Sequence, residues 1–539
     1  MFYILYLPRL SVAGSAVALF GLQVEQPRRQ RRVEFKFLFL RDNFFMIKPI
    51  ILFLLMLSIF PAIVFSQVEQ LIDIGSMPEP KTKLTDNYDE YILITTLNWP
   101  HRGLSSLSAD IAKLVNLKNL NLMDNRLTTL PPEIGQLAQL EELDLTQNRL
   151  SGLPPEIGGL VSLRQLRLMR NELTVLPSEI GQLERLEKLD LFENRLRTLP
   201  PDIGRLRAIK RLDLGINQLT ELPTEMGQLQ NLKILNLSMN QFQAVPPVVL
   251  ELHNLTSFSM GANRLSSLPL GFEKLSKLTT LYLDDNAFSV LPEVIPQLTE
   301  LVELYQNNNQ LSALPKSIGA LSRLMTLKVN NNKLSGLPTE IGQLRALVTL
   351  ELEKNEITSL PATLGQLDKL KYAHLQGNRL SSLPPNIGQL KSLAILQLEG
   401  NRLTTLPPEI GTLQNLTVLN LAHNRLEQLP AQLGNLAKLT TLNLSHNQIT
   451  ELPPALGQLP KLTSLDLAHN RLHTLPPELA GLTGLYRLDL RNNRFTRLPV
   501  EVLSRMKGLR ELQLADNPIL PGEVKALKAA LPGCNISLM

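Results

Sequence analysis

The stretch that decides the fold runs from Leu393 to Asn415 and reads LAILQLEGNRLTTLPPEIGTLQN. Its fixed points are leucines, one asparagine, one proline, one isoleucine and one glycine, namely Leu393, Leu396, Leu398, Asn401, Leu403, Leu406, Pro407, Ile410, Gly411 and Leu413. The asparagine recurs every 23 residues, and once more after 24, at Asn125, Asn148, Asn171, Asn194, Asn217, Asn240, Asn263, Asn286, Asn309, Asn332, Asn355, Asn378, Asn401, Asn424, Asn447, Asn470, Asn493 and Asn517. A period of this length, spelled L-x-x-L-x-L-x-x-N-x-L, predicts a stacked solenoid.

The parts of the unit predict its local structure. Residues 396–399 alternate leucine with Gln397 and Glu399, which is typical of a short strand with one face in a core. Successive strands then lie about 4.8 Å apart in a parallel sheet. A buried column of asparagines can satisfy backbone groups that leave each strand, so we expect a structural asparagine ladder. Residues 406–411 combine proline, an acid and glycine, which favours a one-turn helix or a 3-10 turn.

The repeat resembles the leucine-rich repeat family, and its L-P-x-x-I-G-x-L spelling is similar to the 23-residue class of Ras-group scaffolds, their plant relatives and many bacterial proteins. The resemblance implies an α/β fold. In that fold a curved right-handed coil carries a parallel β-sheet on its concave face and short helical or 3-10 turns on its convex face. It also implies a non-enzymatic module that binds a protein. It does not identify the partner, because the family binds many unrelated ligands.

The domain boundaries follow from where the repeat begins and ends. We expect a solenoid of about 19 repeats over residues 92–520 and a C-terminal cap over 521–539. Residues 67–91 are a polar lead-in. Residues 46–66 resemble a signal peptide that begins at Met46, and residues 1–45 are then an over-extended start or a disordered segment. The alternative for 46–66 is a membrane anchor, although its apolar core of 16 residues falls short of a comfortable span.

Charge and cysteine content narrow the partners and the compartment. Residues 1–66 hold eight Lys and Arg against three Asp and Glu, which accounts for the whole formal charge of +5. The repeats are therefore neutral, and we discard nucleic acid as a partner. Cys534 is the only cysteine, so the paired cysteine caps of secreted animal and plant relatives cannot form. An export signal without cysteine caps indicates a bacterial product that is secreted or on the cell surface, with a cytoplasmic location as the alternative.

The search for chemistry finds no phosphate-binding loop, no H-E-x-x-H pair and no cysteine cluster. We therefore predict no enzyme, no catalytic residue, no cofactor and no metal. One outward column, His423, His446 and His469, allows two interpretations. Three imidazoles in register could bind a metal or sense pH, but a solvated stripe is the more common explanation.

The most informative region is the one where the consensus fails. Between Asn240 and Asn309 the Ile-Gly step is replaced three times, by 249–250, 272–273 and 295–296, and Gln306 occupies a core position. Tyr282 and Tyr305 occupy the same outward position in adjacent repeats, with polar neighbours at Asp284, Asp285 and Asn307. Aromatic side chains among polar groups are typical of interface hot spots. The other interpretation is sequence drift. A second, weaker patch is Tyr372 with His374.

The functional hypotheses belong to different classes. The first is a non-enzymatic protein-protein interaction module that binds its partner on the concave face through Tyr282 and Tyr305. The second is a cell-surface adhesion protein that binds glycan, which the single tryptophan disfavours because sugar sites usually stack rings. The third is an intracellular signalling scaffold of the Ras-group type. In each case a membrane is reached only through an uncleaved N-terminal segment.

Overall fold

The structure, a computed structural model, describes residues 92–520 and 522–538. The predictions for residues 1–45, for the signal peptide or anchor at 46–66 and for the lead-in at 67–91 lie outside the described residues. All elements below belong to the described part of the chain.

One parallel sheet of twenty strands runs through the described residues, and each strand pairs with the next in chain order. The register advances by 23 residues, as in Leu97 opposite Leu120, until β18, after which it advances by 24. The strands are β1 (Thr96–Asn98), β2 (Asn119–Asn121), β3 (Glu142–Asp144), β4 (Gln165–Arg167), β5 (Lys188–Asp190), β6 (Arg211–Asp213), β7 (Ile234–Asn236), β8 (Ser257–Ser259), β9 (Thr280–Tyr282), β10 (Glu303–Tyr305), β11 (Thr326–Lys328), β12 (Thr349–Glu351), β13 (Tyr372–His374), β14 (Ile395–Gln397), β15 (Val418–Asn420), β16 (Thr441–Asn443), β17 (Ser464–Asp466), β18 (Arg487–Asp489), β19 (Glu511–Gln513) and β20 (Asn535–Ser537).

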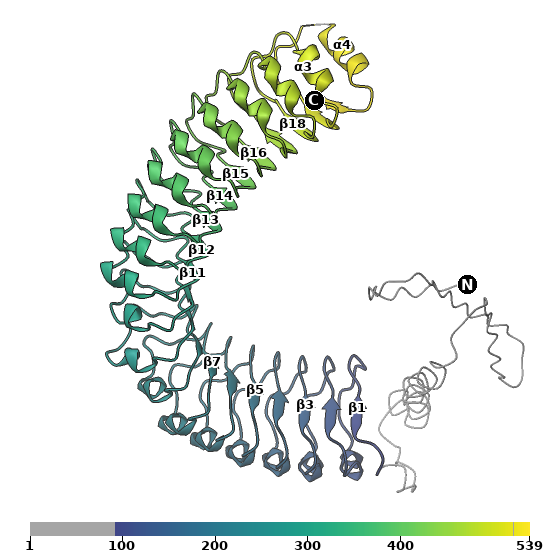
Figure 1. The fold of residues 1–539 in the computed structure, drawn as a ribbon. Coiled ribbons are helices and arrows are strands. Elements are labelled where there is room, and N and C mark those ends of the chain that lie inside the picture. Colours follow the sequence, from purple (N-terminus) through teal and green to yellow (C-terminus); the bar gives the residue numbers. More distant parts are fainter. Residues whose placement is uncertain (1–91, 521, 539) are drawn as a thin grey trace, which may run out of the picture. The chain divides into compact units, whose positions relative to one another are not determined.

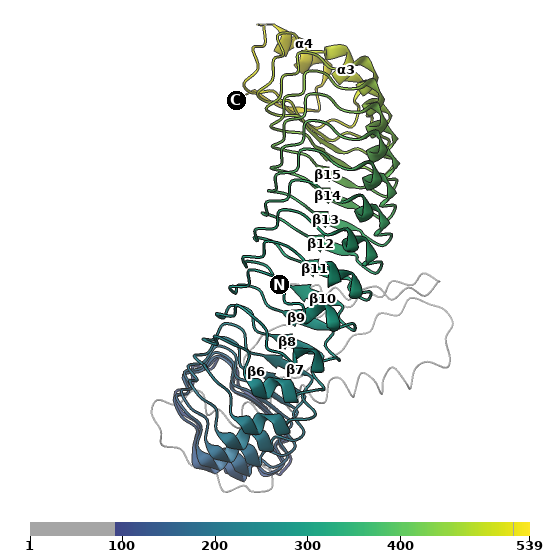
Figure 2. The same cartoon turned by 90° about the vertical axis from the view of Figure 1, so that its left-hand side faces the viewer.

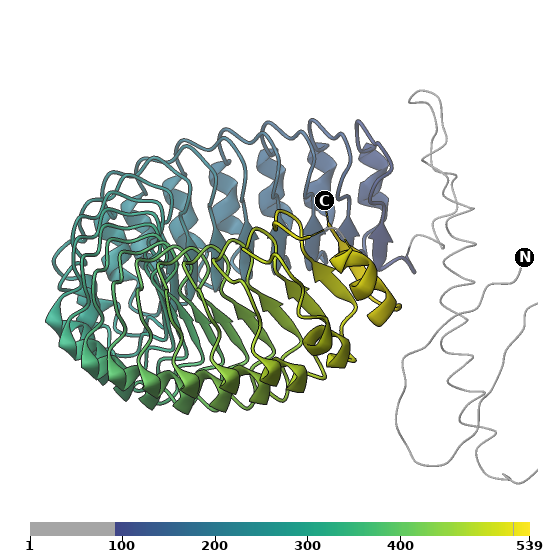
Figure 3. The ribbon, with the colours of Figure 1, turned by 90° about the horizontal axis from the view of Figure 1, so that it is seen from above.

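Short 3-10 turns form the opposite side of the coil. They are η1 (Ala109–Lys113), η2 (Pro132–Gln136), η3 (Pro155–Gly159), η4 (Ser178–Gln182), η5 (Pro201–Arg205), η6 (Thr224–Gln228), η7 (Pro247–Glu251), η8 (Phe272–Lys274), η9 (Ile295–Gln297), η10 (Lys316–Ala320), η11 (Thr339–Gln343), η12 (Ala362–Gln366), η13 (Pro385–Gln389), η14 (Pro408–Thr412), η15 (Ala431–Asn435), η16 (Pro454–Gln458) and η17 (Pro477–Gly481). Figures 1 and 3 show the strands lining the inner side of the curved solenoid and the turns its outer side. The predicted solenoid, with its parallel sheet and 3-10 turns, is confirmed.

The core lies between these two layers, and it is built from the consensus leucines. Each strand from β1 to β19 has a buried central residue between two outward-facing ones, as Leu396 has between Ile395 and Gln397. Leu398 and Leu403, which flank the asparagine, have no exposed surface. A strand with one buried residue is too short to hold itself, so the repeats depend on stacking. Figure 2 shows this stacking along β6 to β15.

The asparagine column joins three consecutive repeats through backbone hydrogen bonds. The Nδ2 of Asn401 donates to the carbonyl oxygens of Leu398 in its own repeat, at 3.0 Å, and of Leu375 in the preceding repeat, at 2.9 Å. Its Oδ1 accepts a hydrogen bond of 3.0 Å from the backbone N–H of Leu380. The same pattern begins at Asn125, whose Oδ1 accepts from two backbone N–H groups of the first repeat. These side chains therefore satisfy the buried backbone groups at each bend.

The residue before each ladder position adopts the left-handed conformation, which the sequence analysis did not predict. Its φ lies near +55° in the repeats of the described chain, as at Gln147 (φ +60°) and Asn308 (φ +52°). Ten of the seventeen non-glycine residues with positive φ are Asn, Asp or His, the types that tolerate this conformation best. Two repeats use glycine there, Gly377 and Gly400. The backbone thus selects the residue type at one outward position of every repeat.

On the convex side, a glycine lets successive 3-10 turns approach closely. A Cβ placed on Gly181 would lie 2.5 Å from the carbonyl oxygen of Asp202 in the next turn, a distance that real Cβ atoms do not show. The Ile-Gly step of the consensus is therefore a packing requirement between backbones. Leu250, Glu273 and Pro296 stand at this position in three consecutive repeats.

The turns change where the glycine is missing. The turns η8 and η9 have three residues each, whereas the other 3-10 turns of the described chain have five. Phenylalanines fill the core there, with the rings of Phe258 and Phe272 6.2 Å apart. In the next repeat Gln306 is fully buried, and neither its Nε2 nor its Oε1 has a hydrogen-bond partner. The repeats of β8 to β10 are thus the irregular part of the described solenoid.

The C-terminal end is covered by three elements that depart from the repeat. A six-residue α-helix, α3 (Val500–Arg505), replaces the 3-10 turn after β18, and a second helix, α4 (Glu523–Ala530), follows β19. Leu527 of α4 is fully buried, in agreement with the helical spacing of the apolar residues there. The strand β20, which the sequence analysis did not predict, pairs with β19 through Ile536 opposite Leu512. It covers a sheet edge that would otherwise expose its polar groups.

We predict that Asn401→Ala lowers the free energy of unfolding by on the order of 3 kcal/mol, because it leaves two carbonyls and one N–H of the core without a partner. Urea denaturation followed by circular dichroism measures this loss. The matched control is Asn435→Ala, an exposed side chain in η15 that makes no side-chain hydrogen bond in the described structure. Equal loss in the two variants would contradict the structural role of the column.

The opposite change is expected at Gln306. Leucine occupies the equivalent position in the preceding repeat, Leu283, and valine in the following one, Val329. Gln306→Leu removes two unsatisfied polar atoms, so we expect a higher urea midpoint and a gain of about 1–3 kcal/mol. Gln432→Leu, at an exposed site, is the control and leaves the midpoint unchanged. A lower midpoint for Gln306→Leu would show that the amide is satisfied in solution.

Candidate functional site

The outward face of the sheet presents four side chains from each repeat. In the repeat of β9 they are Thr280 and Tyr282, at the two ends of the strand, followed by Asp284 and Asp285. We call the positions of these four residues the first, second, third and fourth rows. Neighbours within one row are 23 residues apart in sequence, and adjacent strands place them about 5 Å apart. Each row is therefore a continuous column of side chains along the inner face.

Tyr282 and Tyr305 are neighbours in the second row, and their rings stack. The ring centroids are 4.5 Å apart and the planes differ by 20°. The ammonium of Lys328, next in the row, lies 5.6 Å from the centroid of Tyr305 and pairs with Glu351 at 2.9 Å. The sequence analysis did not single out Lys328, although its 23-residue distance from Tyr305 is the signal that points to it. The structure thus brings the two predicted tyrosines into one aromatic stack with a cation at one end.

The tyrosine hydroxyls remain protonated at neutral pH. Burial, and then the negative charge of Glu303, raises the pKa of Tyr305 to about 12. Burial and Glu303 also raise the pKa of Tyr282. Both side chains are half-buried, so each offers part of its ring and its hydroxyl to the outside. The stack can therefore contribute apolar contact and hydrogen bonding at the same place.

The third row beside the tyrosines is a chain of hydrogen bonds. Asp284 Oδ1 accepts from both the backbone N–H and the Nδ2 of Asn307, each at 2.8 Å. Asn307 Oδ1 accepts from the backbone N–H of Asn330, and Asn330 Oδ1 accepts from that of Glu353, again at 2.8 Å. Burial raises the pKa of Asp284 despite the hydrogen bonds from Asn307. The predicted residues Asp284 and Asn307 are thus held rigidly next to the stack.

The fourth row repeats this arrangement at the exposed edge. Asn308 Nδ2 donates to Asp285 Oδ1 at 2.8 Å, and Asn331 Nδ2 donates to Asn308 Oδ1 at 2.7 Å. All three residues have the left-handed backbone, so the conformation alone favours Asp and Asn at these positions. The structure therefore gives Asp285 a backbone reason as well as a place beside the tyrosines.

The second predicted patch does not join the first. Tyr372 is exposed at the start of β13, three strands from Tyr305, which corresponds to about 14 Å along the sheet. His374 Nδ1 lies 3.8 Å from a carboxylate oxygen of Glu353. The small Ala373 between them is buried where other strands have leucine. These two side chains form a separate, smaller feature of the sheet face.

The repeat of β8, on the other side of the tyrosines, has small side chains in all four rows. They are Ser257, Ser259, Gly261 and Ala262. Ser259 pairs with Tyr282 in the sheet register, so the small residues lie directly beside the aromatic stack. The sequence analysis noticed the failed consensus here but not this set. Reading the outward positions row by row would have found it.

The three histidines of the fourth row stack on one another. The ring centroids of His423 and His446 are 4.0 Å apart, and so are those of His446 and His469, with planes 12° apart in both pairs. Burial, and then the two neighbouring imidazoles, lowers the pKa of His446. Rings that lie face to face cannot aim their nitrogens at one ion, and within residues 92–520 and 522–538 no three acidic, histidine or cysteine side chains could hold a metal. The histidines also suit their left-handed backbone.

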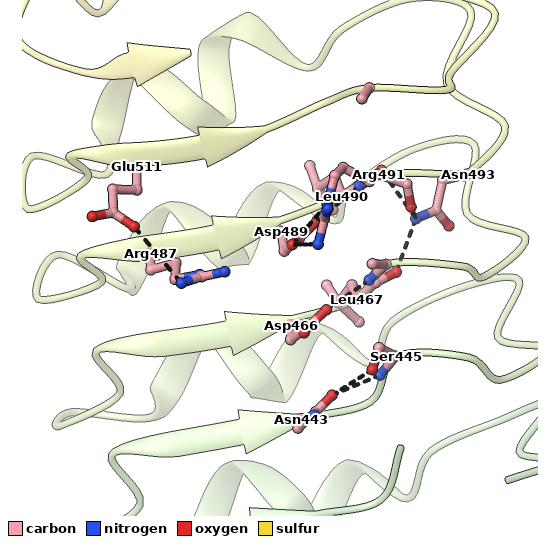
Figure 4. A network of polar contacts seen from close by, with 12 residues as sticks. Asn443, Ser445, Asp466, Leu467, Arg487, Asp489, Leu490, Arg491, Asn493 and Glu511 are labelled. Carbon is pink, nitrogen blue, oxygen red and sulfur yellow. Dashed lines mark hydrogen bonds and ion pairs between the residues drawn. The ribbon is translucent and has the colours of Figure 1, made fainter. Parts of the chain in front are cut away.

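Charged side chains near the C-terminal end of the sheet are paired with one another (Figure 4). Arg491 Nη2 donates to Asp489 Oδ2 at 2.8 Å, and its Nε contacts both carboxylate oxygens at 3.0 Å. Asp489 is fully buried, so this pair is a structural one. Arg487 lies 3.9 Å from Glu511, as Figure 4 also shows. The arginines of this region are therefore committed to neighbouring acids, unlike the aspartates beside the tyrosines.

Membrane insertion was tested on the described helices, and none is long and apolar enough to cross a bilayer. The predicted anchor lies outside the described residues.

Comparison with known proteins follows from this geometry. A family model described as a leucine-rich repeat region matches residues 315–397, 362–444 and 430–528. A second model, described as leucine rich repeat, matches residues 115–173, 161–219, 184–242 and 230–288. A search of curated proteins found no match.

Solved structures resemble the chain over most of its length. A leucine-rich repeat protein of Leptospira interrogans is 34% identical with a TM-score of 0.61, and the match covers 86% of this chain and 100% of that one. The ectodomain of the Arabidopsis receptor kinase HAESA, solved with an IDA peptide hormone ligand, is 30% identical with a TM-score of 0.61, over 80% and 75%. YopM of Yersinia enterocolitica is 27% identical with a TM-score of 0.60, over 84% and 90%.

Proposed function

The chain belongs to the leucine-rich repeat family, and on that premise we propose that it is a non-enzymatic module that binds a protein partner on the inner face of its sheet. We propose Tyr282 and Tyr305 as the anchors of that contact, with Asp284, Asp285 and Asn307 as its polar surround. Tyr372 and His374 form a secondary contact further along the sheet.

The observation that carries the proposal is the rigid aromatic stack in the irregular part of the sheet. The two rings lie 4.5 Å apart, Lys328 covers one end, and hydrogen-bonded columns fix the neighbouring side chains. A preorganised surface loses little side-chain entropy on binding, and half-buried tyrosines are the side chains that dominate many protein interfaces. The polar columns on one side exclude water without themselves supplying much affinity.

Two similar structures support a protein or peptide partner over other ligands. HAESA was solved with a peptide hormone, and the plant receptor RGFR1, 27% identical with a TM-score of 0.60, was solved with RGF2. Both are extracellular-type receptors in which a leucine-rich repeat array holds a peptide ligand. The likeness supports the class of partner and leaves its identity to experiment.

We also propose that the chain is exported, starting at Met46 and cleaved near Gln67, as the charge, apolar core and small residues of 46–66 indicate. N-terminal sequencing of the protein from separated fractions of its native host measures this. We expect a mature start near Gln67 in the exported fraction. An intact N-terminus in the cytosol would refute export and favour the scaffold hypothesis, whereas an intact N-terminus in the membrane would favour the anchor.

The binding proposal predicts the behaviour of a tyrosine variant. Tyr305→Ala is expected to reduce capture of the partner from host fractions at least tenfold, because hot-spot truncation removes 2 kcal/mol or more, roughly. The melting temperature stays nearly unchanged, since the side chain is outside the leucine core. Pull-down on the immobilised full chain, followed by mass spectrometry, measures capture.

The control is Tyr486→Ala, an exposed tyrosine next to β18, far along the sheet from the stack. A partner that is lost from Tyr305→Ala but kept by Tyr486→Ala supports the proposed site. Capture by both variants at the wild-type level would remove the tyrosines from the interface. Recognition of sugars on a carbohydrate array, with no protein captured, would favour the glycan-binding hypothesis instead.

A further inference from the structure

The small side chains of the β8 repeat form a notch across the inner face of the sheet. Ser257, Ser259, Gly261 and Ala262 fill its four rows, and no larger side chain of that repeat points outward. Larger residues follow in the next repeat, where Tyr282 stands in the second row. The strands β7 and β9 on either side are two spacings, about 10 Å, apart. That width accommodates one extended peptide segment lying along β8.

One wall of the notch is the open face of an aromatic ring. Tyr282 has Tyr305 on one side, 4.5 Å away, and its register partner on the other side is Ser259. Within the described residues no ring and no cation stacks on that second face. The row of Tyr282, Tyr305 and Lys328 is thus closed by a cation at one end and open at the end that faces the notch.

The carboxylates beside this open ring face lack a cation. Asp284 uses Oδ1 for its two hydrogen bonds with Asn307, and its Oδ2 has no hydrogen bond in the described structure. Neither Asp284 nor Asp285 forms an ion pair with any described residue. Other acids of the sheet face do: Glu351 pairs with Lys328, Asp489 with Arg491 and Asp144 with Arg167. The region around the notch therefore has an uncompensated negative charge.

The closed end of the stack shows what would complete the open end. There, the ammonium of Lys328 lies over the ring of Tyr305 and pairs with the carboxylate of Glu351 at 2.9 Å. The open end offers the same two elements, a ring face and a carboxylate, without the cation. A guanidinium suits this place better than an ammonium, because it is planar, stacks on rings and binds a carboxylate through two N–H groups.

We propose that the notch at β8 holds an extended segment of the protein partner, with an arginine side chain stacked on Tyr282 and paired with Asp284. This inference rests on the proposed function and specifies its ligand. Charge complementarity and the width of the notch select a basic, unfolded segment over an acidic one or a helix.

The test uses the full chain and a displayed library of random linear dodecapeptides. We expect the wild-type chain to enrich peptides with arginine, and replacement of that arginine by lysine or glutamine to weaken binding of a selected peptide about three- to tenfold. Asp284→Asn keeps the shape of the side chain and removes its charge, so it should weaken the same peptide by a similar factor.

Ser259→Tyr is the sharper variant, because it fills the notch and covers the open face of Tyr282 while leaving both tyrosines and both aspartates in place. The matched control is Asn443→Tyr, in the same row at β16. We expect arginine enrichment to disappear with Ser259→Tyr and to persist with Asn443→Tyr, with similar melting temperatures for both. Absence of arginine enrichment on the wild-type chain, or equal enrichment on the two variants, would overturn the inference.

The outcome is separable from that of the proposed function. If Tyr305→Ala loses the natural partner while Ser259→Tyr keeps it, the tyrosines bind the partner and the notch does not. If Ser259→Tyr also loses the partner, and the selected arginine peptide competes with the partner for the wild-type chain, both the site and its ligand class are supported.

Discussion

The buried amide of the ladder asparagine is the interaction on which the rest of the structure depends. Each repeat has only three residues of strand, so the sheet alone leaves most backbone groups at the bend unpaired. One side chain, such as Asn401, meets two carbonyls and one N–H of neighbouring turns within 3.0 Å. This geometry fixes the distance from one turn to the next, and with it the left-handed residue that precedes each asparagine. A 23-residue period then follows from the need to repeat that bend.

The sequence predicts the parts of the fold that this constraint controls. The period, the inward leucines and the proline-led turns are all local, so the solenoid could be inferred from one unit, 393–415. It does not predict the features that depend on which side chains become neighbours. Lys328 is the cap of a tyrosine stack only because the register places it beside Tyr305. The unsatisfied amide of Gln306 depends on its neighbours in the same way, because a glutamine at a core position could have found a partner in another packing.

Sequence could propose the tyrosines as a site but could not weigh them against drift. The structure adds that their irregularities coincide. The repeats that lose the close-packing glycine, at Leu250, Glu273 and Pro296, are those that carry the notch and the aromatic stack or lie directly beside them. On the convex side the loss of glycine keeps adjacent backbones from their usual approach, and the turns η8 and η9 shorten to three residues. The same repeats thus depart from the consensus on both faces, and the departures on the inner face are organised by hydrogen bonds and stacking.

A regular inner face has a difficulty that these departures resolve. Nineteen nearly equivalent strands offer a ligand many equivalent positions, each shifted by one strand spacing of about 4.8 Å. A segment that binds one of them could bind its neighbours almost as well, so affinity would not become a defined register. Register requires a place where the row changes character within one repeat. The second row does this from Ser259 to Tyr282, passing from a small hydroxyl to a stacked ring, and it changes again at Lys328. The ladder asparagines make the face uniform, so specificity must come from the few repeats in which the outward side chains differ from those on both sides.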